Sequence, residues 1–289
     1  MFRKIALLFS CLFLAHPFFS DRLQAESGHG TPRFDVGPYV STITYQEPRV
    51  MKESGRMSGV DAALVWHGGR YANLFDTIRL EGVAGRGTVD YSSSQSGTIM
   101  GIDNALFETR AIFGRDFAQK EQATFSSYTG FGYRHLSDRT GGLISSAGGH
   151  GYDRVSRYLY LPVGLGVVSQ MGRGWTFEST IEYDLFLKGI QTSRLTQTSD
   201  SDYTCLNDVT NNQSYGKGMK IALRFTKDRG DKARLALEPF LNYWSIGASR
   251  DAYFAIVDHT VTPATTEQYR AWEPENNSTE VGLRVLLLF

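Results

Sequence analysis

Two pairs of neighbouring polar residues could activate a nucleophile. Asp258 and His259 are adjacent in the sequence, and a carboxylate that orients an imidazole can make that imidazole a general base toward water. Ser137 follows His135 by two positions, and a neutral imidazole beside a hydroxyl can turn the hydroxyl into a nucleophile. A polar loop and a polar strand end are the simpler interpretations of these two pairs.

The longer catalytic and metal-binding motifs are missing from the sequence. It contains no G-x-x-x-x-G-K-[ST], no H-E-x-x-H and no G-x-S-x-G, so phosphate-loop, zincin and hydrolase-elbow chemistries have no support. Asp200, Asp202 and Asp208 cluster without the glycine and terminal glutamate of a calcium loop, which favours a solvated loop. Cys205 is the only cysteine after the N-terminal segment. We therefore expect no disulfide, metal or cofactor.

A larger set of charged residues alternates with apolar residues, as in a β-strand with one polar and one apolar face. Segment 175–187 is the clearest case, because Glu178, Glu182 and Asp184 all share the polar parity. Segment 218–226 offers Lys220 and Arg224 on its own polar face. We expect the second segment to pair with the first and to separate the three carboxylates with cations.

These charges nearly balance in sign, so pairing inside a closed β-structure is their favoured role. A narrow conducting path past mobile side chains and a buried catalytic pair remain alternatives. No catalytic residue is assigned. The expected lumen ion-pair network comprises Arg79, Glu81, Glu108, Arg110, Glu178, Glu182, Asp184, Lys220, Arg224, Glu238 and Arg284.

The C-terminal segment 279–289 alternates in the same way and ends on an aromatic residue. Its apolar parity holds Val281, Leu283, Val285, Leu287 and Phe289. A strand with one unbroken apolar face opposite a charged face separates lipid from a polar interior. The segment resembles the last strand of Gram-negative outer-membrane β-barrels, where it is the assembly signal. The resemblance implies contact with the barrel-assembly machinery, outer-membrane lipid and lipopolysaccharide.

The N-terminal segment predicts export. Residues 1–4 form a short n-region with two basic residues, residues 5–15 form an apolar stretch, and residues 23–25 make an acceptable cleavage site, as in a secretory signal peptide. We therefore expect a signal over 1–25 and a barrel domain over 26–289. The full sequence has 30 basic and 30 acidic residues, and cleavage of the signal would remove three basic residues and one acidic residue. The remaining balance gives no preference for nucleic acid.

Ten segments alternate with usable regularity, and each has roughly the length that a tilted membrane strand needs. The connections after the odd-numbered segments hold 11, 20, 22, 30 and 34 residues, whereas those after the even-numbered segments hold 6 or 7. Short periplasmic turns and long extracellular loops are typical of outer-membrane barrels. We expect an all-β, up-and-down antiparallel transmembrane barrel of about ten strands. The segments are 33–45, 57–67, 75–85, 106–116, 124–134, 157–168, 175–187, 218–226, 233–244 and 279–289.

Two resemblances to outer-membrane hydrolases bear on function. Ten strands with tall loops resemble the omptin proteases, which activate water with an Asp pair facing an Asp–His pair; Asp258 and His259 form such a pair in a different loop and at a different spacing. His135 and Ser137 resemble the His-x-Ser motif of lipid A 3-O-deacylases. Those enzymes have eight strands and continue with Asn-Ala, where Asp138 and Arg139 stand here.

The sequence as a whole favours a monomeric, non-enzymatic outer-membrane barrel with an envelope-structural or surface-interaction role and possible slow permeation. A porin-like small-solute channel is the first alternative, and an outer-membrane hydrolase is the second. The last two long connections are rich in Ser, Thr, Asn and Tyr, residues that suit adaptable polar contacts at a surface.

Overall fold

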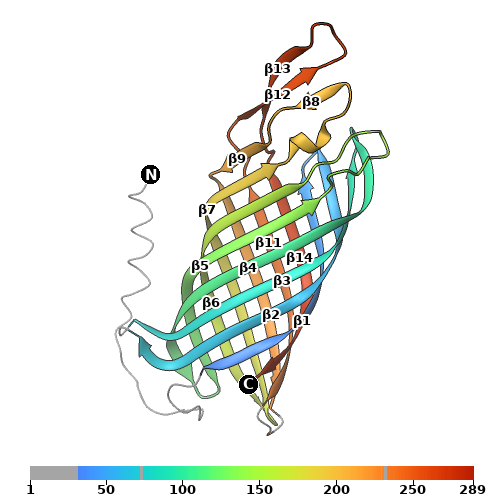
Figure 1. The fold of residues 1–289 in the computed structure, drawn as a ribbon. Helices are drawn as coiled ribbons and strands as arrows, with labels where there is room; N and C mark the ends of the chain where they lie inside the picture. The colour runs from blue at the N-terminus through green and yellow to red at the C-terminus, as the bar shows by residue number, and fades with distance from the viewer. Residues whose placement is uncertain (1–31, 72–73, 229, 231–232) are drawn as a thin grey trace.

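The computed structural model describes residues 32–71, 74–228, 230 and 233–289. Ten strands form a closed antiparallel barrel (Figure 1). Each strand pairs with its neighbours in the chain, and β1 closes the cylinder against β14. The expected signal over 1–25 lies outside the described residues. The barrel strands are β1 (Arg33–Glu47), β2 (Met51–Tyr71), β3 (Phe75–Ser93), β4 (Gly97–Lys120), β5 (Ala123–Arg139), β6 (Arg154–Gly172), β7 (Trp175–Ser193), β10 (Gly216–Lys227), β11 (Arg234–Ile246) and β14 (Asn276–Leu288).

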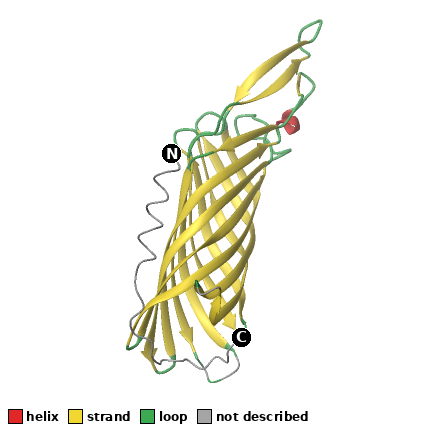
Figure 2. Cartoon of the chain, turned by 90° about the vertical axis from the view of Figure 1, so that its left-hand side faces the viewer, coloured by secondary structure: helices red, strands yellow, loops and turns green. Residues whose placement is uncertain are grey.

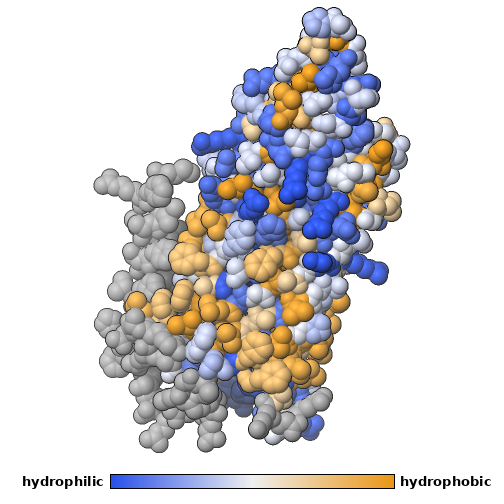
Figure 3. All heavy atoms as spheres, in the orientation of Figure 1, coloured by the Kyte–Doolittle hydropathy of each residue, from blue (hydrophilic) through white to orange (hydrophobic). Residues whose placement is uncertain are grey.

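The outward face carries the apolar residues that the alternation predicted. Val40, Leu80, Phe131 and Leu185 are between 37% and 64% exposed, which is the expected position for side chains that meet lipid. On the face shown in Figure 3, hydrophobic residues gather over the lower part of the barrel and hydrophilic residues over the upper part. The predicted fold class and the two-face pattern are confirmed.

Most strands extend well beyond the segments that alternation delimits. The connection expected over 46–56 is largely strand, because β1 runs to Glu47 and β2 begins at Met51. Apolar alternation stops where the lipid-facing belt stops, but backbone pairing needs no apolar side chain. The prediction of long loops at the first two of these connections is therefore wrong. Each is a tight turn between two strands that extend beyond the apolar belt.

The later connections contain strands of their own. β9 (Val209–Gln213) pairs with the upper end of β7 and extends the barrel wall. Beyond it, β8 (Tyr203–Cys205), β12 (Ala252–Asp258) and β13 (Thr265–Ala271) form a separate three-stranded sheet in the order β13-β12-β8. We call this sheet the tower, because β12 and β13 stand above the barrel at the end opposite the C-terminus (Figures 1 and 2). A 3-10 helix, η1 (Leu195–Thr198), lies in the β7–β8 connection. Among the described residues, no helix is long and apolar enough to span a bilayer.

The C-terminal residue takes part in barrel closure. Phe289 donates its backbone N–H to the carbonyl of Phe34 over 2.9 Å and accepts one from Phe34 over 3.2 Å. Its side chain is 56% exposed on the outward face, in line with the outward apolar residues of β14. The predicted last strand is thus the closing strand.

Deletion of Phe289, or Phe289→Asp, should reduce the amount of folded barrel in the outer membrane while secretion continues. Both changes remove the outward aromatic ring from the segment expected to act as assembly signal, and the deletion also removes the two backbone hydrogen bonds at the seam. Surface labelling and heat-modifiable migration on gels measure the folded fraction. Leu237→Asn, on the outward face of β11, is a control for a general loss of apolar surface. Undiminished surface levels of the Phe289 variants would contradict the assembly role.

Candidate functional site

The lumen is filled in layers, and the inward residues of β1 mark them. Asp35, Tyr39, Ile43 and Glu47 follow one another four residues apart, and all are buried. A carboxylate, an aromatic ring, an aliphatic side chain and a second carboxylate therefore face inward at successive heights. Asp35 belongs to the lowest layer, Tyr39 and Ile43 to an apolar layer above it, and Glu47 to the top layer.

The lowest layer is a network of ion pairs that reaches across the barrel. Arg110 lies 3.0 Å from Glu81 and 2.6 Å from Glu182, and Arg284 lies 2.9 Å from Asp61. These side chains come from five different strands. Further pairs in this layer are Arg79–Glu81, Arg134–Glu108, Lys220–Glu108, Arg224–Asp35, Arg224–Glu238 and Arg284–Glu238.

Strands β7 and β10 pair in the expected register, and the expected ladder of contacts forms in part, since Lys220 lies 4.0 Å from Glu182. Arg224 lies opposite Glu178, and Lys220 lies opposite Glu182. However, Arg224 binds Glu238 and Asp35 instead, because an arginine long enough to reach the barrel centre can meet carboxylates from other strands. Among the described residues, neither Glu178 nor Asp184 has a basic nitrogen within 4 Å. Asp184 is fully buried, and neither of its carboxylate oxygens has a hydrogen-bond partner.

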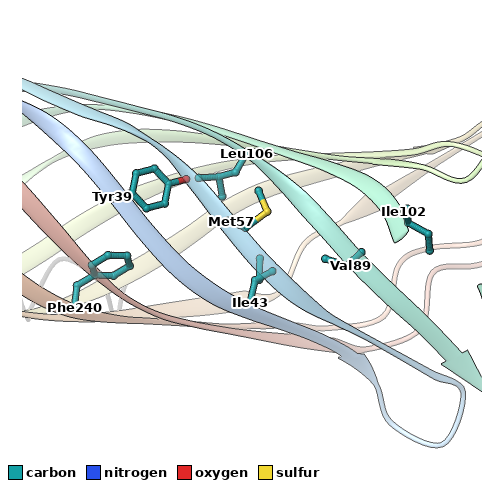
Figure 4. Packing of buried hydrophobic residues seen from close by; sticks show 7 residues of the cluster. All are labelled: Tyr39, Ile43, Met57, Val89, Ile102, Leu106 and Phe240. Atoms are coloured by element: carbon teal, nitrogen blue, oxygen red, sulfur yellow. The ribbon is translucent and has the colours of Figure 1, made fainter. Parts of the chain in front are cut away.

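An apolar layer lies above much of this network. Figure 4 shows Tyr39, Ile43, Met57, Val89, Ile102, Leu106 and Phe240 within the barrel. All seven are at most 5% exposed. Apolar residues at inward positions exclude water from the space between the charged layers.

A second apolar cluster fills the opposite side of the lumen. Trp244 packs edge-to-face on Tyr160, with ring centroids 5.0 Å apart, and also contacts Tyr158. The guanidinium of Arg134 lies 5.9 Å from the centroid of the Trp244 ring, so a cation–π interaction stabilises this buried cation. Trp244 and Tyr160 are 1% exposed, so this side of the lumen is closed by aromatic rings.

The top layer is a cluster of four carboxylates around one arginine, which we call the rim cluster: Glu47, Glu53, Asp138, Arg154 and Glu273. Arg154 donates to Glu47 over 3.0 Å and to Glu53 over 2.7 Å, and it lies 3.6 Å from Asp138. These groups lie beyond the last outward apolar residues of their strands and therefore above the lipid-facing belt.

Tyr45 ties Glu273 into the rim cluster. Its hydroxyl lies 3.0 Å from both Glu47 and Glu273 and donates to carboxylate oxygen. The Arg154 guanidinium lies 5.4 Å from the Tyr45 ring. Because Glu273 belongs to the segment that returns from the tower to β14, this hydroxyl links the tower's base to the barrel wall.

One arginine cannot neutralise four buried carboxylates, so the rim cluster retains protons. Burial, with help from Asp138 and Glu47, raises the pKa of Glu53 to about 8 although Arg154 opposes the shift. Burial and the neighbouring Glu47 likewise raise the pKa of Glu273 to about 7. Burial also raises the pKa of Asp138. The raised pKa values of Glu53 and Glu273 indicate that part of the cluster is protonated near neutral pH.

A cavity of about 20 Å³ lies beneath the rim cluster. Its lining includes Asn104, whose Oδ1 is buried and has no hydrogen-bond partner. This volume has room for about one water molecule. Within the described residues, no group of three or more His, Cys, Asp or Glu side chains is arranged to hold a metal ion.

The rim cluster was not predicted, although a signal for most of it exists in the sequence. Glu47 and Glu53 continue the inward parity of the first two segments, Asp138 continues that of Arg134, and Arg154 continues that of Tyr158. Apolar alternation stops before these residues, so it does not mark them as parts of strands. Extending the parity to the next turn would have placed all four residues inward.

The two residue pairs that could activate a nucleophile, Asp258–His259 and His135–Ser137, lie in separate places with local partners. Asp258 accepts hydrogen bonds from its own turn at Thr260, while His259 pairs with Thr204 over 3.0 Å at the tower. His135 lies on the outward face of β5, with Tyr133 3.4 Å away. Asp200 accepts the backbone N–H groups of Asp202 and Tyr203, as in a loop turn. The contacts of Asp258, His259 and Asp200 are those of exposed polar loops, and the contact of His135 with Tyr133 is a part-buried one within β5.

Comparison with known proteins gives structural matches only. No protein-family model matches the chain, and no curated protein does so. The outer membrane protease OmpT from Escherichia coli superposes with a TM-score of 0.57 at 8% identity, covering 92% of this chain and 99% of its own. The translocator domain of the autotransporter NalP from Neisseria meningitidis matches with a TM-score of 0.40 at 13% identity, covering 98% and 94%. The Pseudomonas putida toluene transporter TodX matches with a TM-score of 0.34 at 8% identity, covering 89% of this chain and 89% of its own.

The fold is therefore that of an outer-membrane β-barrel: ten antiparallel strands closed into a cylinder. The expected architectural likeness to the omptins is confirmed by the OmpT match. At this identity, the match concerns the arrangement of strands and not the chemistry.

Proposed function

We propose that this protein is a sealed, non-catalytic outer-membrane barrel that anchors the tower as a surface-interaction element. The observation that carries the proposal is the filling of the lumen at three heights while the tower stands free beyond it. In this proposal the barrel holds the tower rigidly above the membrane, and the exposed sheet of the tower contacts other surfaces.

The filled lumen argues against solute passage. Ion pairs span its lower part, two apolar clusters fill its middle, and the rim cluster covers its top. Ten strands are close to the size at which side chains alone fill a barrel. A path for ions would require several buried pairs to separate together, and breaking each such pair costs several kcal/mol.

The tower has the composition of a contact surface. Tyr203, Tyr253 and Tyr269 of the tower, and Trp272 directly after β13, are between 42% and 55% exposed. Tyr269 stacks on Phe254, and Arg270 lies over the Trp272 ring at 5.1 Å. Aromatic residues held in place by such neighbours provide large contact area at little cost in conformational entropy.

Outer-membrane lipid and lipopolysaccharide are the proposed surroundings. Just above the apolar belt, exposed basic residues point outward, which suits anionic headgroups. The tower then faces the cell exterior, and the C-terminus faces the periplasm and its assembly machinery. The outward basic residues are Arg56, Arg86, Arg157, Lys188 and Lys217.

The test is a variant in which residues 252–271 are replaced by a short Gly-Ser link. Cells displaying this shortened protein should lose retention on at least one of a panel of surfaces that hold wild-type cells: glass, polysaccharide, protein-coated plastic and a lawn of like cells. Heat-modifiable migration should stay unchanged, because the barrel strands remain paired. Equal retention on every surface would contradict the proposed function.

A further inference from the structure

The tower ends in an unpaired strand edge. Within the described chain, β13 pairs with β12 alone, so its other side is the free edge of the sheet. Six of its seven residues are exposed. Natural proteins usually protect such an edge with proline, charged side chains or a bulge. β13 has no proline and no bulge against β12, and its charged residues are Glu267 and Arg270.

The backbone groups that face the free edge can be identified. The carbonyl of Ala255 accepts a hydrogen bond from the N–H of Leu206, and the N–H of Ala255 donates to Asn207 Oδ1. The backbone groups of Ala255 therefore point toward β8. Alternate residues of an antiparallel strand bond to opposite sides. Phe254 and Ile256 therefore bond to β13 through their partners Tyr269 and Glu267.

The remaining residues of β13 point their backbone N–H and C=O groups outward. These are Thr266, Gln268 and Arg270. They form a row of three donors and three acceptors at alternate positions, which is the chemistry that another β-strand satisfies.

Resting on the proposed surface role of the tower, we propose that this edge pairs with the β13 edge of a second copy of this chain in a facing membrane. β12 leaves the barrel and β13 returns toward it. A copy in an opposed membrane therefore presents its β13 in the antiparallel direction.

The register about Gln268 is self-complementary. With Gln268 opposite its own copy, Thr266 lies opposite Arg270 of the second copy, and all six outward backbone groups find partners. Like charges do not meet, because Glu267 lies opposite Tyr269, whose hydroxyl already donates to Glu267 within one molecule over 2.7 Å. A single pairing of this size is weak, but many copies on two apposed membranes act together.

Gln268→Pro tests the edge with little disturbance of the hairpin. Proline removes only the outward N–H of Gln268 and is tolerated on an edge strand. Gln268→Ala is the matched control, since it loses the same side chain and keeps the N–H. Both variants should retain the heat-modifiable migration of the wild-type protein.

The measurement is energy transfer between donor- and acceptor-labelled phosphatidylcholine–phosphatidylglycerol vesicles carrying purified protein. Wild-type and Gln268→Ala vesicles should cluster, and Gln268→Pro vesicles should fall to the level of protein-free vesicles. Failure of wild-type vesicles to cluster, or equal clustering of the Pro variant, overturns the self-pairing. If the Pro variant still clusters but the 252–271 replacement does not, edge pairing is wrong and the tower keeps its proposed role.

Discussion

Arg224→Ala should lower the free energy of unfolding by about 3–5 kcal/mol, the usual effect of removing one partner from a buried ion pair. Arg224 is the buried cation between Glu238 and Asp35, which lies 3.1 Å away. Its side chain is 4% exposed, so water cannot replace the guanidinium without entering the lumen. Urea unfolding of the refolded protein, followed by tryptophan fluorescence, measures the change.

Two further variants show that the loss arises from the pair. Addition of Glu238→Gln to Arg224→Ala should recover part of the lost stability, because it removes one of the carboxylates that Arg224 had balanced, while Arg284 keeps its pair with Asp61. Arg86→Ala, at an exposed outward position, should change stability by no more than about 0.5 kcal/mol. An unchanged unfolding midpoint for Arg224→Ala together with altered ion selectivity would favour a conducting lumen instead.

Arg154→Ala should be similarly destabilising, by about 3–5 kcal/mol, and more so as the pH rises. Arg154 is the one cation in the rim cluster. Its removal leaves Glu47, Glu53, Asp138 and Glu273 to repel one another once they ionise. Unfolding measured at several pH values separates this variant from the wild type.

The wild-type protein should itself lose stability with rising pH. Glu53 and Glu273 have pKa values raised to about 8 and about 7 from an ordinary 4.5. The folded rim therefore keeps protons that the unfolded chain releases near pH 4.5, and stability falls as the pH rises from about 5 to about 8. Glu53→Gln should flatten this dependence. A wild-type free energy of unfolding that is constant or increases across that pH window would contradict the retention of protons by the folded rim cluster.

The membrane-facing half of the structure could be predicted because lipid imposes a strict pattern. Segment 175–187 has the clearest alternation, and its inward Glu178, Glu182 and Asp184 follow from parity alone. Backbone pairing then fixes β10 beside β7, as expected.

The remaining contacts could not be predicted because they depend on distance across the lumen. Arg224 selects Glu238 and Asp35 over the facing Glu178, a choice set by the length of arginine and the width of the barrel. The tower was missed for a related reason. β13 is exposed on both faces, so it has no alternation to detect.

Single-channel current across a planar bilayer tests the central claim most directly. Purified wild-type protein, inserted and verified by protease protection, should give no stepwise conductance above the bare bilayer in 1 M salt, roughly the condition in which exposed charges are screened and buried pairs are not. Reproducible unitary steps whose ion selectivity changes with Glu182→Gln would show that the lumen conducts and would contradict the sealed barrel.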